Sequence, residues 1–174
     1  MSTVRRLSQG RVTADFFTSS YRFSASIVVY KRRLIDVLSD RMTDYLDMVD
    51  IYVSRINNPG SIVATYQKGS LVKNEITFIL LPDEVEGTSK ERFYTPRDNI
   101  PVFISVPSFE IHGQLQWGAS ELDIKKILSI ETQNFLPIIE ATAANSLLPD
   151  VTYHGPMALV NKTKVQVLCG DNQD

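Results

Sequence analysis

The sequence has few of the residues on which disulfides, metal sites and phosphate-binding loops depend. It contains a single cysteine, Cys169, which excludes an internal disulfide and a zinc site built from cysteines. Glycine occurs eight times, and no glycine-rich phosphate-binding or nucleophile motif is present. The histidines, His112 and His154, lack the spacing of a zinc-binding pair. We therefore expect no metal ion, no cofactor and no catalytic residue, and predict that the chain is not an enzyme.

The sequence also lacks long apolar runs and a strong excess of charge. The stretch from Ile76 to Leu81 is among the longest apolar runs, and it is far shorter than the roughly 20 residues that span a bilayer. No apolar run follows Arg5 and Arg6, as a secretory signal would require. With 18 basic and 20 acidic residues, the chain has no global field that would attract nucleic acid or an anionic membrane. We expect a soluble cytoplasmic protein.

What the sequence does contain is one pattern that occurs twice. Residues 21–29 alternate large apolar side chains with small or polar ones, which is typical of a strand with one buried face. The same alternation recurs at 109–117, an offset of 88 positions, and a preceding alternating segment repeats at the same offset. The matched residues are Tyr21 and Phe109, Phe23 and Ile111, Ala25 and Gly113, Ile27 and Leu115, Val29 and Trp117, Val12 and Ile100, Ala14 and Val102, and Phe16 and Ile104.

The next segment matches at an offset of 90 positions. Leu34, Val37 and Leu38 have the i, i+3, i+4 spacing of a short helix with one apolar face, and residues 124–128 repeat it. Ser120, three residues before Asp123, is predicted to cap the second of these helices. Later matches are Ser39 with Ser129, Tyr45-Leu46 with Phe135-Leu136, Met48 with Ile138, Asp50 with Glu140, Leu71-Val72 with Leu159-Val160, Ile76 with Val165, and Phe78 with Val167.

These matches predict a tandem duplication of a small, mainly β (α+β) unit. Each copy is expected to form a five-stranded bent sheet or barrel with one short helix, and the copies to pack in a pseudo-twofold arrangement. The predicted copies are residues 11–81 and 99–169, joined by a polar linker at 82–98 and flanked by tails at 1–10 and 170–174. A unit of this size buries too little surface to be strongly stable alone, so the copies should pack together.

One dense basic run offers an alternative function, the binding of nucleic acid or a nucleotide. Lys31, Arg32 and Arg33 follow Tyr30, and single-strand binding proteins place aromatic side chains beside cations. The matched segment of the second copy, 118–121, is not basic. Because three charges contribute little affinity at physiological salt, a solvated turn is the simpler interpretation.

Acidic residues offer two further interpretations. Five aspartates surround the first predicted helix, but they lack the EF-hand pattern, which favours a solvated acidic face over a cation site. They are Asp36, Asp40, Asp44, Asp47 and Asp50. The third function considered is an enzyme with an unrecognised carboxylate site that contains Glu131 or Glu140, and no motif favours either residue.

Several short motifs resemble those of a small uncharacterised family of bacterial proteins. That family has a unit with G-x-L, R-L-S-D-x-L-N, F-L-x-L and V-N-K in this order. Residues 33–39 and 45–48 are similar to the middle two motifs, 112–115 to the first and 160–162 to the last. Neither copy has the whole set, and Ala25 replaces the glycine in the first copy. The resemblance implies no activity, substrate or cofactor.

The leading hypothesis is a non-catalytic cytoplasmic module for interaction, assembly or regulation. The two predicted copies share apolar core positions and no polar constellation. Exposed edges of packed sheets favour self-association or the binding of a protein partner by strand addition. A protein partner or a second copy of the chain is therefore expected, and nucleic acid is less favoured.

Overall fold

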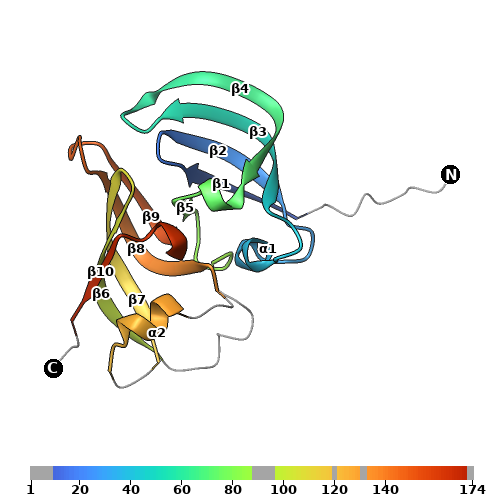
Figure 1. Ribbon diagram of the computed structural model, residues 1–174. Coiled ribbons are helices and arrows are strands. Elements are labelled where there is room, and N and C mark those ends of the chain that lie inside the picture. Colours follow the sequence, from blue (N-terminus) through green and yellow to red (C-terminus); the bar gives the residue numbers. More distant parts are fainter. Residues whose placement is uncertain (1–9, 88–96, 119–120, 130–132, 172–174) are drawn as a thin grey trace.

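The computed structural model describes residues 10–87, 97–118, 121–129 and 133–171. The described part is mainly β, with ten antiparallel strands in one unclosed sheet and two short α-helices. Neither of these helices has the length and apolar character that a membrane span requires. Figure 1 shows the sheet as two strongly bent portions, one from each half of the chain.

The two halves have the same order of element types. The first half forms β1 (Arg11–Phe17), β2 (Tyr21–Val28), α1 (Leu34–Ser39), β3 (Tyr45–Arg55), β4 (Asn58–Val72), the 3₁₀ turn η1 (Lys73–Glu75) and β5 (Phe78–Leu81). The second half forms β6 (Asp98–Val106), β7 (Phe109–Trp117), α2 (Ile124–Ser129), β8 (Phe135–Asn145), β9 (Thr152–Asn161), η3 (Lys162–Lys164) and β10 (Val167–Gly170). The two short helices lie where the apolar spacing predicts them.

The helices begin differently in the two halves. The backbone N–H of Leu34 donates to Glu86 Oε2 at 3.0 Å and that of Ile35 to the Glu86 carbonyl at 3.0 Å, so a residue beyond β5 caps α1. In α2, Asp123 Oδ1 accepts from the backbone N–H of Lys126 at 2.9 Å. Asp123 is the N-cap because the helix begins at the next residue. The prediction of Ser120 as the cap falls on a residue outside the described part of the chain.

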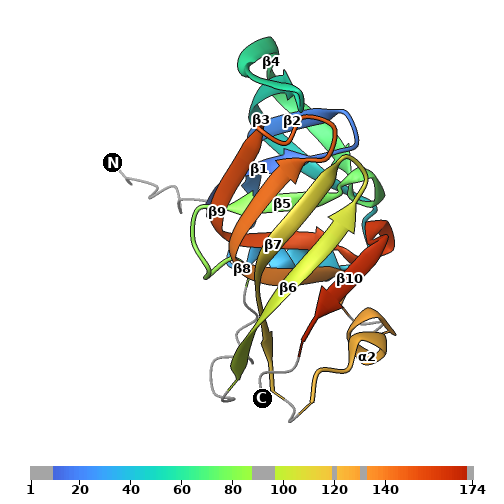
Figure 2. The ribbon, with the colours of Figure 1, turned by 90° about the vertical axis from the view of Figure 1, so that its left-hand side faces the viewer.

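The order of the strands shows how the halves are joined. It is β10-β6-β7-β8-β9-β5-β1-β2-β3-β4, and the halves meet where β5 pairs antiparallel with β9 (Figure 2). A twofold axis would bring the same strand of each half to the interface. Here the last strand of the first half pairs with the fourth strand of the second half, so the predicted pseudo-twofold arrangement is wrong. Of the two forms predicted for each copy, a bent sheet or a barrel, the barrel does not form, because the halves share one open sheet.

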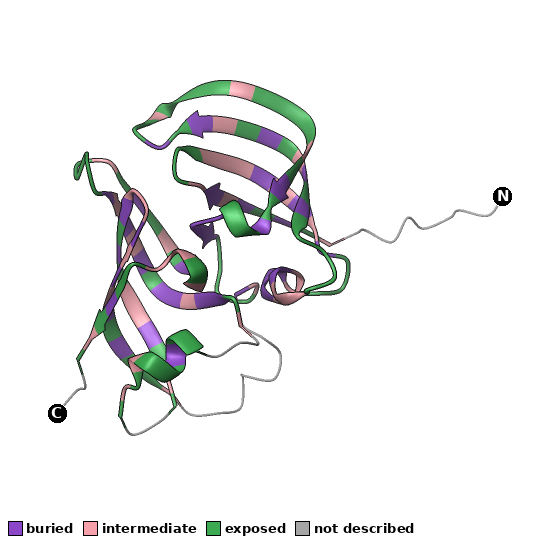
Figure 3. Ribbon diagram, viewed as in Figure 1, coloured by how far each residue is buried: buried purple, intermediate pink, exposed green. Residues whose placement is uncertain are grey.

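The strands β5 and β9 divide their side chains between two hydrophobic clusters. Successive side chains of a strand point to opposite faces of the sheet, and both faces are covered at this junction. The first cluster receives Ile79, Leu81, Met157 and Leu159, and the second receives Phe78, Leu80, Ala158 and Val160. Figure 3 shows β4, at one end of the sheet, as mostly exposed. The junction is therefore part of the core of both halves.

One sequence match is displaced by a residue. Leu46 pairs with Leu71 between β3 and β4, whereas Leu136 pairs with Val160 between β8 and β9. The sequence matched Leu46 with Leu136 and Leu71 with Leu159, and the two registers are not compatible with both matches. Because a shift of one residue exchanges the two faces of a strand, the structural counterpart of Leu71 is Val160.

Candidate functional site

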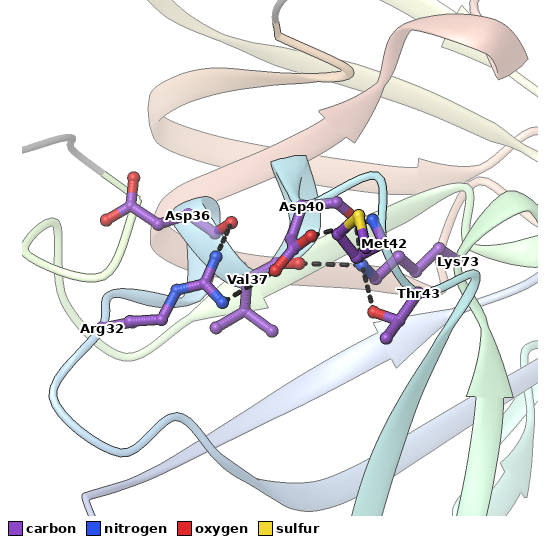
Figure 4. Close-up of polar contacts among 7 residues, drawn as sticks. All are labelled: Arg32, Asp36, Val37, Asp40, Met42, Thr43 and Lys73. Carbon is purple, nitrogen blue, oxygen red and sulfur yellow. Dashed lines mark hydrogen bonds and ion pairs between the residues drawn. The ribbon is translucent and has the colours of Figure 1, made fainter.

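The most deeply buried charged residue of the described chain, Lys73, lies at the end of α1. It is 8% exposed. Its Nζ donates to the carbonyls of Val37 at 2.8 Å and Asp40 at 2.9 Å, and to Thr43 Oγ1 at 3.1 Å (Figure 4). The last carbonyls of a helix have no partner within the helix, and a cation there is favoured by the helix dipole. Lys73 therefore acts as a side-chain cap for α1.

Burial has an electrostatic cost for this ammonium group. Desolvation lowers the pKa of Lys73 from its ordinary value, an effect that the nearby Asp40 carboxylate opposes. The three oxygen acceptors compensate for the water that the ammonium group has lost. The side chain has a structural task, and no substrate or ligand is needed to explain its position.

The second half contains the same arrangement. Lys162, the first residue of η3, donates from Nζ to the carbonyl of Ile127 in α2 at 3.2 Å. Lys73 is likewise the first residue of η1 and bonds to a carbonyl of α1. The lysine of the V-N-K motif therefore holds a helix end. Sequence reasoning missed Lys73, although a lysine 89 positions before Lys162 was the available signal.

The basic run lies in the turn between β2 and α1, and one of its cations is engaged within the molecule. Arg32 Nη1 bonds to Asp40 Oδ2 at 2.9 Å, and Arg32 Nη2 donates to the Asp36 carbonyl at 2.9 Å (Figure 4). Lys31 is exposed, whereas Arg33 is half-buried at the N-cap of α1. The turn does not present three equivalent cations to a nucleic acid.

Hydrogen bonds in this turn also change the pKa of Asp40, the carboxylate that pairs with Arg32. Asp40 Oδ1 accepts from the backbone N–H of Met42 at 2.9 Å. This hydrogen bond, followed by the one from Arg32, lowers the pKa of Asp40 from its ordinary value. The Arg32–Asp40 pair thus closes the loop that encloses α1, with the backbone of Met42 as its second anchor.

The remaining aspartates are separated from one another. Asp47 accepts from Ser70 at 3.0 Å, and Asp50 lies 3.6 Å from Arg11. Within the described residues, no three histidine, cysteine, aspartate or glutamate side chains gather closely enough to hold a metal ion. The acidic cluster seen in the sequence is therefore spread over α1, the turn that follows it and the strand β3.

Among the described residues, the carboxylate considered for catalysis and the two histidines do not come together in one site. Glu140 is exposed at a bulge of β8 with φ 51°, and Asp50 has the same conformation in β3 with φ 52°. Glu131 lies outside the described residues. His112 is exposed with its ring beside Phe103, and His154 is exposed on β9. These side chains lie at a bulge or on the surface of a strand, and they do not form a common site.

The junction between the halves carries an aromatic cluster. The rings of Phe17 and Phe78, from the first half, stack with centroids 4.3 Å apart. Phe109, from the second half, meets them edge-on at 5.5 and 5.0 Å, and Tyr153 lies 4.8 Å from Phe17. Such pairs contribute beyond the area that they bury. The halves are held together by aromatic packing in which the three phenylalanine rings are fully buried.

Polar groups at the junction are satisfied by hydrogen bonds across it. Asn161 is buried, and its Nδ2 donates to the carbonyl of Ile76 at 2.8 Å. Its backbone N–H donates to Thr77 at 3.0 Å, and the Tyr153 hydroxyl donates to the carbonyl of Ile56 at 3.2 Å. These bonds fix the register of β5 against β9.

The two outer strands of the sheet, β4 and β10, differ from this junction. In the part of the chain that the structure describes, each of them pairs with a strand on one side alone. Apolar side chains remain exposed on them: Ile62 is 59%, Tyr66 63% and Val72 49% exposed on β4, and Val167 is 47% exposed on β10. An unpaired edge with exposed apolar side chains is a site for strand addition. These edges are the candidate functional site.

Comparison with other proteins gives no independent assignment of this site. No protein-family model, no curated protein sequence and no solved structure matches the chain. The resemblance to a small bacterial family, drawn from short motifs, stays a prediction. The contacts of the chain itself are what bear on its function.

Proposed function

We propose that the chain is a non-catalytic, cytoplasmic assembly module that binds protein through the edges of its sheet. The observation that carries this proposal is the β5–β9 junction. There the edge strand of one half is completed by an edge strand of the other, which is strand addition within one molecule. The outer edges, β4 and β10, offer the same backbone groups to a second protein.

We further propose that the two halves are copies of one unit. The order of element types supports this, and so does the helix-capping lysine at matched positions, Lys73 and Lys162. The bulge residues with positive φ, Asp50 and Glu140, are a further match that is independent of hydrophobicity. Duplication gives each half two sheet edges of the same kinds. One pair of these edges, β5 and β9, is joined inside the chain, and the other pair, β4 and β10, stays open.

The exposed tyrosine on β4 provides a direct test. Tyr66→Lys places a charge on the outer strand, where Tyr66 is 63% exposed, so folding should be unaffected while binding of protein at this edge is lost. Tyr52→Lys is the matched control, because Tyr52 is 50% exposed on the neighbouring strand, which is already paired on both sides. Light scattering and affinity capture of purified wild-type and variant protein provide the measurements.

The expected result is association, with itself or with a captured protein, that Tyr66→Lys removes and Tyr52→Lys retains. A wild-type chain that stays monomeric at high concentration and captures no protein in an edge-dependent manner would overturn the proposal. Unchanged fluorescence and thermal unfolding in the two variants would show that any change in association is due to lost binding and not to lost folding.

A further inference from the structure

We propose that β10 of one molecule adds antiparallel to β4 of a second copy, in the register that the chain uses between β5 and β9. This inference rests on the proposed function and identifies its partner as another molecule of the same chain. The junction inside the chain joins two different edges, so the same contact between molecules would link copies head to tail.

The equivalence of the strands follows from their pairing. β5 and β10 each follow a 3₁₀ turn and pair with the first strand of their half, with Phe78 opposite Phe17 and Val167 opposite Ser105. β4 and β9 each precede that turn and pair with the long strand after the helix. Within the chain, β5 pairs with β9. Their counterparts in the other halves, β10 and β4, are the two outer strands, so they are the strands available for the same contact between molecules.

The internal register can be transferred directly. Inside the chain, Phe78 lies opposite Val160 and Leu80 opposite Ala158. Between molecules, the corresponding pairs are Val167 with Leu71, Leu168 with Ser70, Cys169 with Gly69 and Gly170 with Lys68. The four residues of β10 match the four of β5, so the new contact has the same length as the internal one.

The exposed side chains of the two edges fit this contact. Val167 is 47% exposed, whereas Phe78, its counterpart at the internal junction, is 0% exposed because β9 and its neighbours cover it. Pairing with β4 would cover Val167 in the same way.

The contact between molecules should be weaker than the junction inside them. β4 presents Ser70 and Lys68 where β9 presents Leu159 and Met157. Less apolar surface is therefore buried, and assembly should depend on protein concentration. Because the contact is head to tail, copies form a ring if the rotation closes and a filament if it does not.

The single native cysteine makes a covalent test available. Gly69→Cys introduces a thiol on β4 directly opposite Cys169 of the next molecule. Directly opposed residues of an antiparallel pair have Cα atoms about 4.5–5.5 Å apart, within the range that a disulfide bridges. Every molecule then carries one thiol on each outer edge, so mild oxidation should give a ladder of dimers, trimers and larger species on a non-reducing gel.

Two controls separate this ladder from random oxidation. Gly60→Cys places the second thiol near the start of β4, where a Cβ meets nothing within 4 Å, and should give little or no ladder under the same mild oxidation, because no thiol of the next molecule is held opposite it. Gly69→Cys combined with Cys169→Ser should give no ladder. A Cβ at Gly69 approaches Ile51 Cδ1 at 2.7 Å, which the flexible end of that side chain can relieve, and circular dichroism checks the fold.

A second variant decides the question even if Gly69→Cys does not fold. Val167→Lys changes a side chain that is exposed in the single molecule, and should weaken self-association about tenfold or more, since burying a valine is worth roughly one order of magnitude in affinity. Val85→Lys is its control, because Val85 is 50% exposed and follows β5, which is an interior strand of the sheet. Light scattering over a concentration series measures the effect.

The outcomes distinguish this inference from the proposed function. A ladder that Gly69→Cys gives and Gly60→Cys does not, with weaker association in Val167→Lys, supports the head-to-tail contact. Edge-dependent binding of another protein without the ladder and without an effect of Val167→Lys overturns this inference and leaves the proposed function standing. A strictly monomeric chain with no ladder and no edge-dependent capture overturns both.

Discussion

The β5–β9 junction and the outer edges of the sheet are built from corresponding strands with different side chains. At the junction, alternate residues of both strands are apolar on either face, so two cores meet through one pair of strands. On β4 the residues in the corresponding places include Lys68 and Ser70. A permanent contact and a reversible one can thus use the same backbone geometry, and the side chains decide between them.

The largest difference in stability between the junction and an outer edge is expected for substitutions in the aromatic cluster. Phe78→Ala should lower the free energy of unfolding by about 3–5 kcal/mol, because the ring is fully buried against Phe17 and Phe109. Val167→Ala, at the corresponding place on β10, should change it by less than about 0.5 kcal/mol in the single molecule. Urea unfolding at low protein concentration measures both. Equal losses would mean that β10 is as well packed as β5.

The next largest difference concerns the buried asparagine at the junction. Asn161→Ala removes the donor to the carbonyl of Ile76 and should cost about 1–3 kcal/mol, since that oxygen lies in a buried place. Val72→Ala is the matched change on β4, where the side chain is 49% exposed, and should be nearly neutral. Thermal unfolding of the two variants provides the measurement, and a neutral Asn161→Ala would show that water replaces the amide.

The two capping lysines provide a finer comparison. Lys73→Met leaves two carbonyls and a hydroxyl without their donor and should cost about 1–3 kcal/mol. Lys162→Met should cost less, because Lys162 is less buried and its bond to Ile127 is 3.2 Å long. Denaturant unfolding of both variants tests the order, and a larger loss for Lys162→Met would contradict it.

The smallest difference is expected from the ion pair at the end of α1. A carboxyl whose pKa is lower in the folded state stabilises the fold above its unfolded pKa, and this contribution is lost as the pH falls through the folded pKa. The ordinary value is 3.8, and the pKa of folded Asp40 lies below it. The melting temperature of wild type should therefore exceed that of Asp40→Asn near neutral pH, and the gap should shrink in acid.

Asp150→Asn is the control for this pH dependence, because Asp150 is exposed in the turn between β8 and β9. Its melting temperature should follow that of the wild type across the same pH series. A gap between wild type and Asp40→Asn that stays constant down to strongly acidic pH would contradict the assignment to the carboxylate.

Part of this fold is readable from the sequence because it depends on local periodicity. The strands β2 and β7 and the two short helices lie where alternation and i, i+3, i+4 spacing predict them. The length of β4 is not readable, since an outer strand with Lys68, Ser70 and other polar side chains has no buried face to impose alternation. Leu71 was matched with Leu159 instead of Val160 for a different reason: residues 157–160 are all apolar, and an apolar run contains no information on register.

The arrangement of the halves could not be predicted from periodicity. The pseudo-twofold expectation assumed that like strands meet, whereas the choice between β5–β9 and any other pair depends on shape at the aromatic cluster. Lys73 was missed because an isolated lysine on a polar surface is indistinguishable from one that folds back onto a helix end. The basic run drew attention through its charge, although Arg32 is paired with Asp40.

The capping of α1 by Glu86 has a consequence for how the protein is made. The first helix receives its initial hydrogen bonds from a residue that follows β5, and β5 itself waits for β9, near the other end of the chain. During synthesis from the N-terminus, β5 can pair with β1, but its other edge stays unpaired until most of the second half has left the ribosome. Chaperone occupancy on nascent chains should rise after residue 81 is exposed and fall once β9 has appeared.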